Sequence, residues 1–413
     1  FRHMVGAWVL HVLMTEVAPS ALPQGEEDPF LQMNQMTIEN ICCDHFESAC
    51  WSKYDFQEML KADALPSGYI ELCLGFGRRL HELPEPAWLQ AELARVSEVL
   101  DSGQQRITRE ALDRAEAQAS KSSHPLCRFE VVGKKLRVCK AVHTFGHLRS
   151  LWRTLSIIHY HQGFPDGLVF LVSSWDAEST EYPAPVFARC GPHDSKSIIL
   201  LPSEFQTAWN YQHFVKKATA SHDTAPFLSR LPVAFWRGST SDYLQERAQA
   251  GGLSVAQEIR RWSRLRLATL SRLFPSRIDA QFTSIHDHVP SALAAWIREG
   301  GLCCAERAEL SELRRFRYLV NADATLGVAD RLHWYLLTGS LVLQQESNYT
   351  LWLMGTAIQA GVHYLPVDRG WQDLLASMDW AEEHPAEAEA MVRRAYEVAR
   401  DAMSQEAIFL YLH

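Results

Sequence analysis

Arginine, glycine and hydroxyl side chains follow an apolar run at residues 233–236, in the order Arg237-Gly238-Ser239-Thr240-Ser241. The guanidinium of Arg237 is a planar, bidentate donor that suits phosphate oxygens, and the hydroxyls of Ser239 and Thr240 can add hydrogen bonds. Gly238 has no side chain, so a ligand can approach the backbone closely there. The segment therefore indicates a phosphate or diphosphate site, although an ordinary polar turn has the same composition.

A second segment of related chemistry runs from Asn321 to Arg331, again directly after an apolar run. Its pattern predicts a strand end, a loop that contains Gly327, and a helix with Arg331 in its first turn. A cation is unfavourable at the positive end of a helix dipole unless an anion is bound there. The neighbouring Asp330 offers the alternative explanation, because its carboxylate neutralises the charge. Together, the two segments favour a diphosphate site.

The elements that must position these segments alternate along the chain. Apolar runs typical of buried strands occur at 167–173, 198–201, 233–236, 318–321, 340–343 and 362–367. Helical patterns separate most of them, as at Ser254–Leu273 and Gly327–Leu337. This alternation predicts an α/β fold with parallel sheets covered by helices on both faces. In such sheets ligands bind beyond the carboxyl ends of the strands, where both segments are expected.

Length and composition agree with a large globular protein. At about 150 residues per domain, the 413 residues predict two or three domains. A hydrophobic content of 47% with 22% charged residues excludes wholesale disorder, collagen and coiled coil. The net charge of −9 gives no general attraction to nucleic acid or to anionic membranes.

Two features favour an oxidising, secretory environment. Residues 4–15 are uncharged and precede the small residues of 18–21, which is typical of a cleavable signal peptide; a partly buried N-terminal helix is the alternative. Cys127 and Cys139 bracket two alternating runs about Gly133. This arrangement predicts a hairpin in which the two cysteines face each other and can form a disulfide.

Further motifs follow in a fixed order along the second half of the chain. They are Trp236-Arg-Gly-Ser-Thr240, Arg264-Leu-Arg-Leu-Ala-Thr-Leu-Ser271, Ile278-Asp-Ala-Gln-Phe-Thr283, Arg317-Tyr-Leu-Val-Asn-Ala-Asp323, Arg331, Gly339-Ser-Leu-Val-Leu-Gln-Gln-Glu-Ser347, Val362-His-Tyr-Leu-Pro-Val367 and Met378-Asp-Trp-Ala381. In this order they resemble glycosyltransferase family 90, which comprises the CAP-type capsule-associated proteins and the KDEL-motif protein O-glucosyltransferases and xylosyltransferases. The resemblance covers residues 125–400.

The resemblance implies a GT-B fold, in which two Rossmann-like lobes carry the active site between them. It implies an inverting transfer of glucose or xylose from a UDP-sugar without a metal or other cofactor, and the sequence contains no Asp-x-Asp motif for a metal–diphosphate complex. Arg237 and Arg331 would neutralise the charge that develops on the departing UDP. The other donor-binding positions that the resemblance implies are Gly238, Ser239, Thr240, Arg266, Asp279, Asn321 and Glu346.

Inversion requires a general base that takes the proton of the acceptor hydroxyl. In the family this base is an Asp upstream of Pro-Val-Phe, and Asp176 matches it before Pro185-Val186-Phe187, at a shorter spacing than in the better-known members. Trp175 offers an apolar wall for a sugar, and Glu178 is the competing carboxylate. A lone Asp in a loop also suits a turn or a cap. Ala329 departs from the Ser that family members often have two residues before the donor arginine.

Two other functions remain open. The segment His286-Asp287-His288, with His159 and His161, offers metal ligands for a hydrolase. A GT-B pseudoenzyme or lectin-like secretory protein would keep the fold without turnover, and Ala329 together with the shifted spacing after Asp176 favours it.

The expected organisation is a signal-like, flexible lead at 1–35, a helical segment at 36–120, an acceptor lobe at 121–220, a UDP-sugar lobe at 221–380 and closing helices at 381–413. We expect a monomer that is lumenal in the endoplasmic reticulum or Golgi, or secreted. Its expected partners are a UDP-sugar and a protein or polysaccharide acceptor, with no nucleic acid and no membrane span beyond an N-terminal signal. Glucose and xylose differ by one hydroxymethyl group, so the choice between them stays open.

Overall fold

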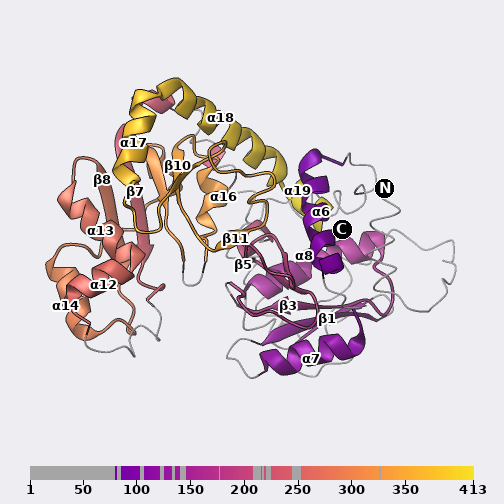
Figure 1. Cartoon of the computed structure of the whole chain (residues 1–413). Coiled ribbons are helices and arrows are strands. Elements are labelled where there is room, and N and C mark those ends of the chain that lie inside the picture. The colour runs from indigo at the N-terminus through magenta and orange to yellow at the C-terminus, as the bar shows by residue number, and fades with distance from the viewer. Residues whose placement is uncertain are drawn as a thin grey trace, which may run out of the picture. The chain divides into compact units, whose positions relative to one another are not determined.

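The computed structural model describes residues 80, 85–102, 107–120, 125–132, 135–139, 146–175, 177–207, 215, 218–219, 225–243, 253–324 and 327–413. The chain divides into two compact units (Figure 1). Unit 1 comprises Phe1–Arg189, Asp194–Asn210 and Ile408–His413, and unit 2 comprises Cys190–His193 and Tyr211–Ala407. The predicted lead at 1–35 and the proposed base Asp176 lie outside the described residues.

Unit 1 is built on a sheet of the order β2-β1-β3-β4-β6. Its elements are α6 (Ala87–Ser102), α7 (Arg109–Ala119), β1 (Leu126–Val132), β2 (Lys135–Val138), α8 (Gly146–Gln162), β3 (Val169–Ser173), β4 (Val186–Ala188), β6 (Ile198–Leu200) and α9 (Glu204–Thr207). Strands β3, β4 and β6 are parallel, as expected, but β1 is antiparallel to both β2 and β3. This sheet is therefore mixed rather than parallel, because a hairpin supplies its first two strands.

The hairpin β1–β2 carries the cysteine pair singled out in the sequence. Phe129 pairs with Val138, and the next backbone hydrogen bond runs from Cys139 N to Arg128 O over 3.1 Å. Cys139 thus lies opposite Arg128, one residue from the expected register. A disulfide joins it to Cys127, with the two Cα atoms 5.3 Å apart.

Unit 2 is built on a parallel sheet of the order β12-β10-β9-β7-β8. Its strands are β7 (Leu231–Ser239), β8 (Ile278–Ser284), β9 (Phe316–Asn321), β10 (Leu341–Gln345) and β12 (Leu365–Val367), and a separate antiparallel pair is formed by β5 (Cys190–Pro192) and β11 (Tyr349–Leu351). Every residue of β10 is buried, which is the burial of a strand covered on both faces. The predicted α/β class is confirmed.

Helices lie on both sides of this sheet (Figure 1). The helices of unit 2 are η3 (Phe227–Ser229), α12 (Val255–Arg261), α13 (Ser263–Leu273), α14 (Ser291–Glu299), α15 (Leu310–Leu313), α16 (Arg331–Tyr335), α17 (Leu374–Glu383) and α18 (Pro385–Ala402). Most of α19 (Gln405–Leu412) belongs to unit 1. One apolar core includes Trp236 of β7, Trp262 between α12 and α13, and Leu341 of β10. No helix among the described residues is long and apolar enough to cross a membrane.

Two predicted helices differ from those observed. The pattern at Ser254–Leu273 forms two helices, because Trp262 has an extended backbone (φ −100°, ψ 106°) that turns its indole into the core. There the indole Nε1 donates to Asp242 Oδ2 over 2.8 Å. The pattern at Gly327–Leu337 is helical only over the five residues of α16. A helix this short has too few aligned peptides for the dipole argument, so the role of Arg331 rests on its side chain.

Candidate functional site

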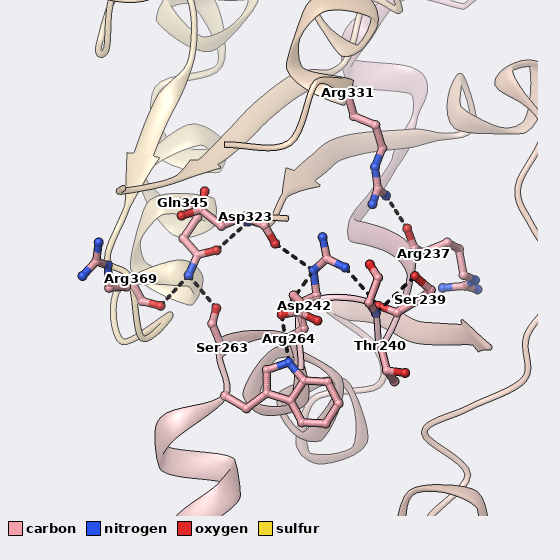
Figure 2. Close-up of polar contacts among 12 residues, drawn as sticks. Arg237, Ser239, Thr240, Asp242, Ser263, Arg264, Asp323, Arg331, Gln345 and Arg369 are labelled. Carbon is pink, nitrogen blue, oxygen red and sulfur yellow. Dashed lines mark hydrogen bonds and ion pairs between the residues drawn. The ribbon is translucent and has the colours of Figure 1, made fainter. Parts of the chain in front are cut away.

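Polar side chains gather where the parallel strands of unit 2 end (Figure 2). Strand β7 ends at Ser239, β9 at Asn321 and β10 at Gln345, and all three strands run in the same direction. The two segments predicted to bind a diphosphate therefore leave the same edge of one sheet. This edge is where open α/β sheets bind ligands.

The two arginines that the sequence singled out meet at this edge. Arg331 Nη1 donates to the main-chain oxygen of Arg237, across 94 residues of sequence (Figure 2). Arg331 is half-buried, so part of the residue is accessible to solvent. The structure thus brings the end of β7 together with the helix after β9.

The side chain of Arg237 is engaged within the sheet. Its Nη1 lies 2.8 Å from Asp279 Oδ1 of the neighbouring strand β8, and its Nη2 donates to Asp279 Oδ2 over 3.0 Å. The same guanidinium lies over the ring of Phe235, 4.4 Å from the ring centre. Both Arg237 and Asp279 were predicted to contact the donor. In this structure they form an ion pair with each other, so an anion would have to compete with Asp279 for Arg237.

The packing of Trp236 requires a glycine at position 238, in addition to the room that a glycine leaves for a ligand. A Cβ atom at this position would lie 2.4 Å from Cζ2 of the fully buried Trp236 indole. The register between β7 and β8 also shifts between Gly238 and Ser239. Any side chain here would displace the indole and with it the end of β7.

The buried Thr240 fixes the loop after β7 through hydrogen bonds to His286 and His288. It is fully buried, and its Oγ1 accepts a hydrogen bond from His286 N over 2.8 Å. His288 Nε2 donates to the Thr240 carbonyl over 3.2 Å. We expected the Thr240 hydroxyl to face the donor, whereas the structure turns it inward. The histidines of the alternative metal hypothesis hold this same loop.

Asn321 is also buried, at the end of β9. Its Nδ2 donates to Gln344 Oε1 over 2.7 Å and to the Ala329 carbonyl over 3.0 Å. Its Oδ1 is buried and has no hydrogen-bond partner among the described residues. The backbone of Ala329, which replaces the expected Ser, is thus tied to the end of β9.

Several residues of this edge were not assigned a role from the sequence. Gln345 Oε1 accepts from Asp323 N over 2.8 Å, and its Nε2 donates to the Arg369 carbonyl over 2.7 Å. Arg264, almost fully buried, donates to two carbonyls at the strand ends. Burial raises the pKa of Asp323 to about 6, although a hydrogen bond with Ser347 and the charge of Arg264 lower it. These contacts join distant segments, so spacing along the sequence could not reveal them.

Two other predicted donor residues have different surroundings. Arg266 donates to the carbonyls of Ile259, Arg260 and Gly370, so it ties the end of α12 to the loop after β12. The predicted nucleotide contact of Arg266 would have to displace these bonds. Glu346 is exposed directly after β10, and its backbone N donates to Val367 O over 2.8 Å. Its side chain is accessible to a ligand.

In unit 1, the loop after β3 is organised by Glu178. This carboxylate is buried, and its Oε2 accepts from Ser173 Oγ over 2.9 Å. Its Oε1 accepts from the backbone N of Ser179 and Thr180 over 3.0 Å and 2.9 Å. Trp175 is half-buried beside it. Because both oxygens of Glu178 already serve the loop, Glu178 is poorly placed to act as a base, which favours its competitor Asp176.

The alternative hypothesis of a metal hydrolase requires a cluster of metal ligands. Among the described residues, no group of three or more His, Cys, Asp or Glu side chains could hold a metal ion. His286 and His288 stack with ring centres 5.4 Å apart. His159 Nδ1 accepts from Phe164 N over 2.8 Å. These described histidines have structural contacts.

The chain is similar to several known glycosyltransferases. It is 22% identical over 301 residues to protein O-glucosyltransferase 2 of Danio rerio, covering 70% of this chain and 54% of that protein. It is 27% identical over 244 residues to protein O-glucosyltransferase 3 of Mus musculus, covering 57% of this chain and 42% of that protein. The chain thus spans about half the length of these curated relatives.

Among solved structures, the C-terminal domain of a glycosyl transferase group 1 family protein (LpcC) from Francisella tularensis matches 40% of this chain and 83% of that domain, with a TM-score of 0.25 and 12% identity. The model of a protein family described as "Glycosyl transferase family 90" matches residues 88–413, which cover all of unit 2 and part of unit 1. The chain belongs to glycosyl transferase family 90.

Proposed function

We propose that the protein is an inverting, metal-independent glycosyltransferase that moves glucose or xylose from a UDP-sugar to a hydroxyl of a protein or glycan acceptor in the secretory pathway. Membership of family 90 and similarity to proteins named O-glucosyltransferases support a sugar-transfer reaction. The predicted N-terminal signal and the disulfide between Cys127 and Cys139 support a lumenal or secreted location.

The observation that carries the donor site is the meeting of Arg331 with the end of β7. Its guanidinium lies at the carboxyl edge of a parallel sheet, and part of the residue is accessible to solvent. A guanidinium there can bind diphosphate oxygens bidentately and stabilise the charge that develops as UDP departs. Charge from arginine would replace the charge of a metal ion, in keeping with a sequence that has no Asp-x-Asp motif.

The acceptor step needs a base, and we assign this role to Asp176. Asp176 would take the proton of the acceptor hydroxyl as that oxygen forms a bond to the anomeric carbon and UDP leaves from the opposite side. Glu178 supports this assignment indirectly, because its two oxygens bind Ser173, Ser179 and Thr180.

A second candidate function is a GT-B pseudoenzyme or lectin-like protein that binds a nucleotide or sugar without turnover. The ion pair between Arg237 and Asp279 favours it, because a donor arginine that is already paired with a carboxylate contributes less to a departing diphosphate. UDP binding without sugar transfer is the behaviour that this alternative predicts.

Thermal unfolding with UDP, UDP-glucose and UDP-xylose, each with and without EDTA, tests the proposal. A ligand that binds only the native state adds about 2.7 kcal/mol of stability at about 100 times its dissociation constant. We expect a shift that is insensitive to EDTA and that ranks the two sugars. No shift with any of the three compounds contradicts the donor site, and a shift abolished by EDTA contradicts metal independence.

A further inference from the structure

Arg264 joins the two strand ends that carry the proposed donor site. From the first turn of α13, its Nη1 donates to the carbonyl of Ser239 over 2.9 Å, and its Nε donates to the carbonyl of Asp323 over 2.8 Å (Figure 2). Ser239 ends β7, and Asp323 follows the end of β9. One planar side chain therefore sets the distance between the two loops.

The carboxylate of Asp242 compensates the charge of Arg264. Its Nε lies 3.6 Å from Asp242 Oδ2, and the same oxygen accepts a hydrogen bond from Trp262 Nε1 over 2.8 Å. The guanidinium also lies over the Trp236 indole, 5.6 Å from the ring centre. These contacts fix the orientation of the buried Arg264 side chain.

A guanidinium in this position is costly for the protein. Burial lowers the pKa of Arg264, and the charge of Arg331 lowers it further, against the opposing charges of Asp242 and Asp323. Arg331 is thus near enough for the two cations to interact. An anion bound by Arg331 would reduce the repulsion between the two arginines. The buried cation is therefore better tolerated when a ligand such as a diphosphate is bound.

We infer that Arg264 is a positioning residue of the donor site: by donating to the carbonyls of Ser239 and Asp323, it holds the loops after β7 and β9 at the spacing that UDP requires. The inference rests on the proposed function, because UDP is the ligand whose diphosphate these loops would enclose. Arg264 itself need not touch UDP.

The experiment compares Arg264→Lys and Arg264→Met with the matched control Arg230→Lys. Arg230 is a buried arginine of the same unit, also 3% exposed, and it likewise donates to carbonyl oxygens, those of Thr338 and Ala225. It lies just before β7, at the start of the strand rather than at its carboxyl end. The readouts are the dissociation constant of UDP by calorimetry and the melting temperature.

Lysine keeps the charge but lacks the fork that reaches both carbonyls, whereas methionine keeps only the volume. We expect Arg264→Lys to raise the dissociation constant about tenfold and Arg264→Met to raise it further. Arg230→Lys should lower the melting temperature without changing UDP affinity. Unchanged UDP affinity in both Arg264 variants overturns the inference, and so does an equal loss of affinity in Arg230→Lys.

Asp242→Asn tests the same arrangement with the guanidinium in place, for the case in which neither Arg264 variant folds. It removes the carboxylate charge that compensates Arg264 and is nearly isosteric, so we expect weaker UDP binding. Unchanged affinity in Asp242→Asn overturns the inference. If the wild-type protein binds no UDP, the proposed function itself fails. If the wild type binds UDP and the variants bind it equally well, only this inference fails.

Discussion

The environments of Arg237 and Arg331 differ, and this difference ranks their contributions to UDP binding. Arg237 is paired with Asp279 at 2.8 Å, whereas the hydrogen bond from Arg331 Nη1 goes to an uncharged carbonyl. Among the described residues, a diphosphate must compete with a carboxylate for Arg237 but with a carbonyl for Arg331. We expect Arg331→Ala to weaken UDP binding by about tenfold or more and Arg237→Ala to weaken it less. Calorimetric titration of both variants measures this, and the opposite order would show that UDP breaks the pair with Asp279.

Asp323 gives the protein a measurable pH dependence of stability. Burial raises the pKa of Asp323 to about 6 in the folded state, above the ordinary value of 3.8. The folded state therefore binds more protons than the unfolded state between these values. The stabilisation is fully present below the unfolded pKa and is lost as the pH rises through about 6.

We expect the stability of the wild type relative to Asp323→Asn to fall by up to about 3 kcal/mol between pH 4 and pH 7. Asparagine does not titrate, so the difference isolates this carboxyl from all others. Urea unfolding of both proteins across this pH range gives the two curves. Parallel curves would show that Asp323 titrates normally in the folded protein.

The strand-end motifs allowed part of this site to be predicted from the sequence. Arg237, Asn321 and Arg331 could be placed at one sheet edge because apolar runs precede their segments. The hidden contacts of Arg264 could not be predicted, because its partners Ser239 and Asp323 lie 25 and 59 residues away along the chain. The inward turn of Thr240 likewise depends on His286, which a local pattern does not reveal.

At the scale of elements, strands were visible in the sequence as apolar runs, which coincide with β3, β6, β7, β9, β10 and β12. Strand β8 was not predicted as a strand because its buried residues Ile278, Ala280 and Phe282 alternate with half-buried polar residues. Such alternation indicates a strand less strongly than a continuous apolar run does. The helix break at Trp262 was not predicted for a different reason: it depends on the tertiary contact of the indole with Asp242.

The hairpin β1–β2 offers a test at this scale. Its disulfide joins cysteines 12 residues apart, whereas the disulfide between Cys303 and Cys304 joins neighbours. Loop-closure entropy predicts a loss of about 3 kcal/mol for Cys127→Ser/Cys139→Ser. Cys303→Ser/Cys304→Ser is the matched control, because a bond between adjacent residues closes no chain loop. Urea unfolding of both double variants gives the comparison, and equal losses would contradict the entropic explanation.

At the scale of the whole molecule, the proposed donor residues belong to unit 2, while the sequence that carries the proposed base belongs to unit 1. In the proposed mechanism sugar transfer uses residues of both units, whereas UDP binding uses residues of unit 2. This division makes binding and turnover separable by mutation. Because the chain spans about half of its curated relatives, such separation is best measured on this chain directly.

Asp176→Asn and Glu178→Gln together test the division of roles. If Asp176 is the base, its amide variant loses about 10²- to 10⁴-fold in kcat, while UDP affinity and melting temperature stay near those of the wild type. Glu178→Gln replaces one accepting oxygen with a donor and so removes the hydrogen bond to Ser173 or those to the backbone N of Ser179 and Thr180; its melting temperature should fall. A large loss of kcat in Glu178→Gln at an unchanged melting temperature, with Asp176→Asn fully active, would instead make Glu178 the base.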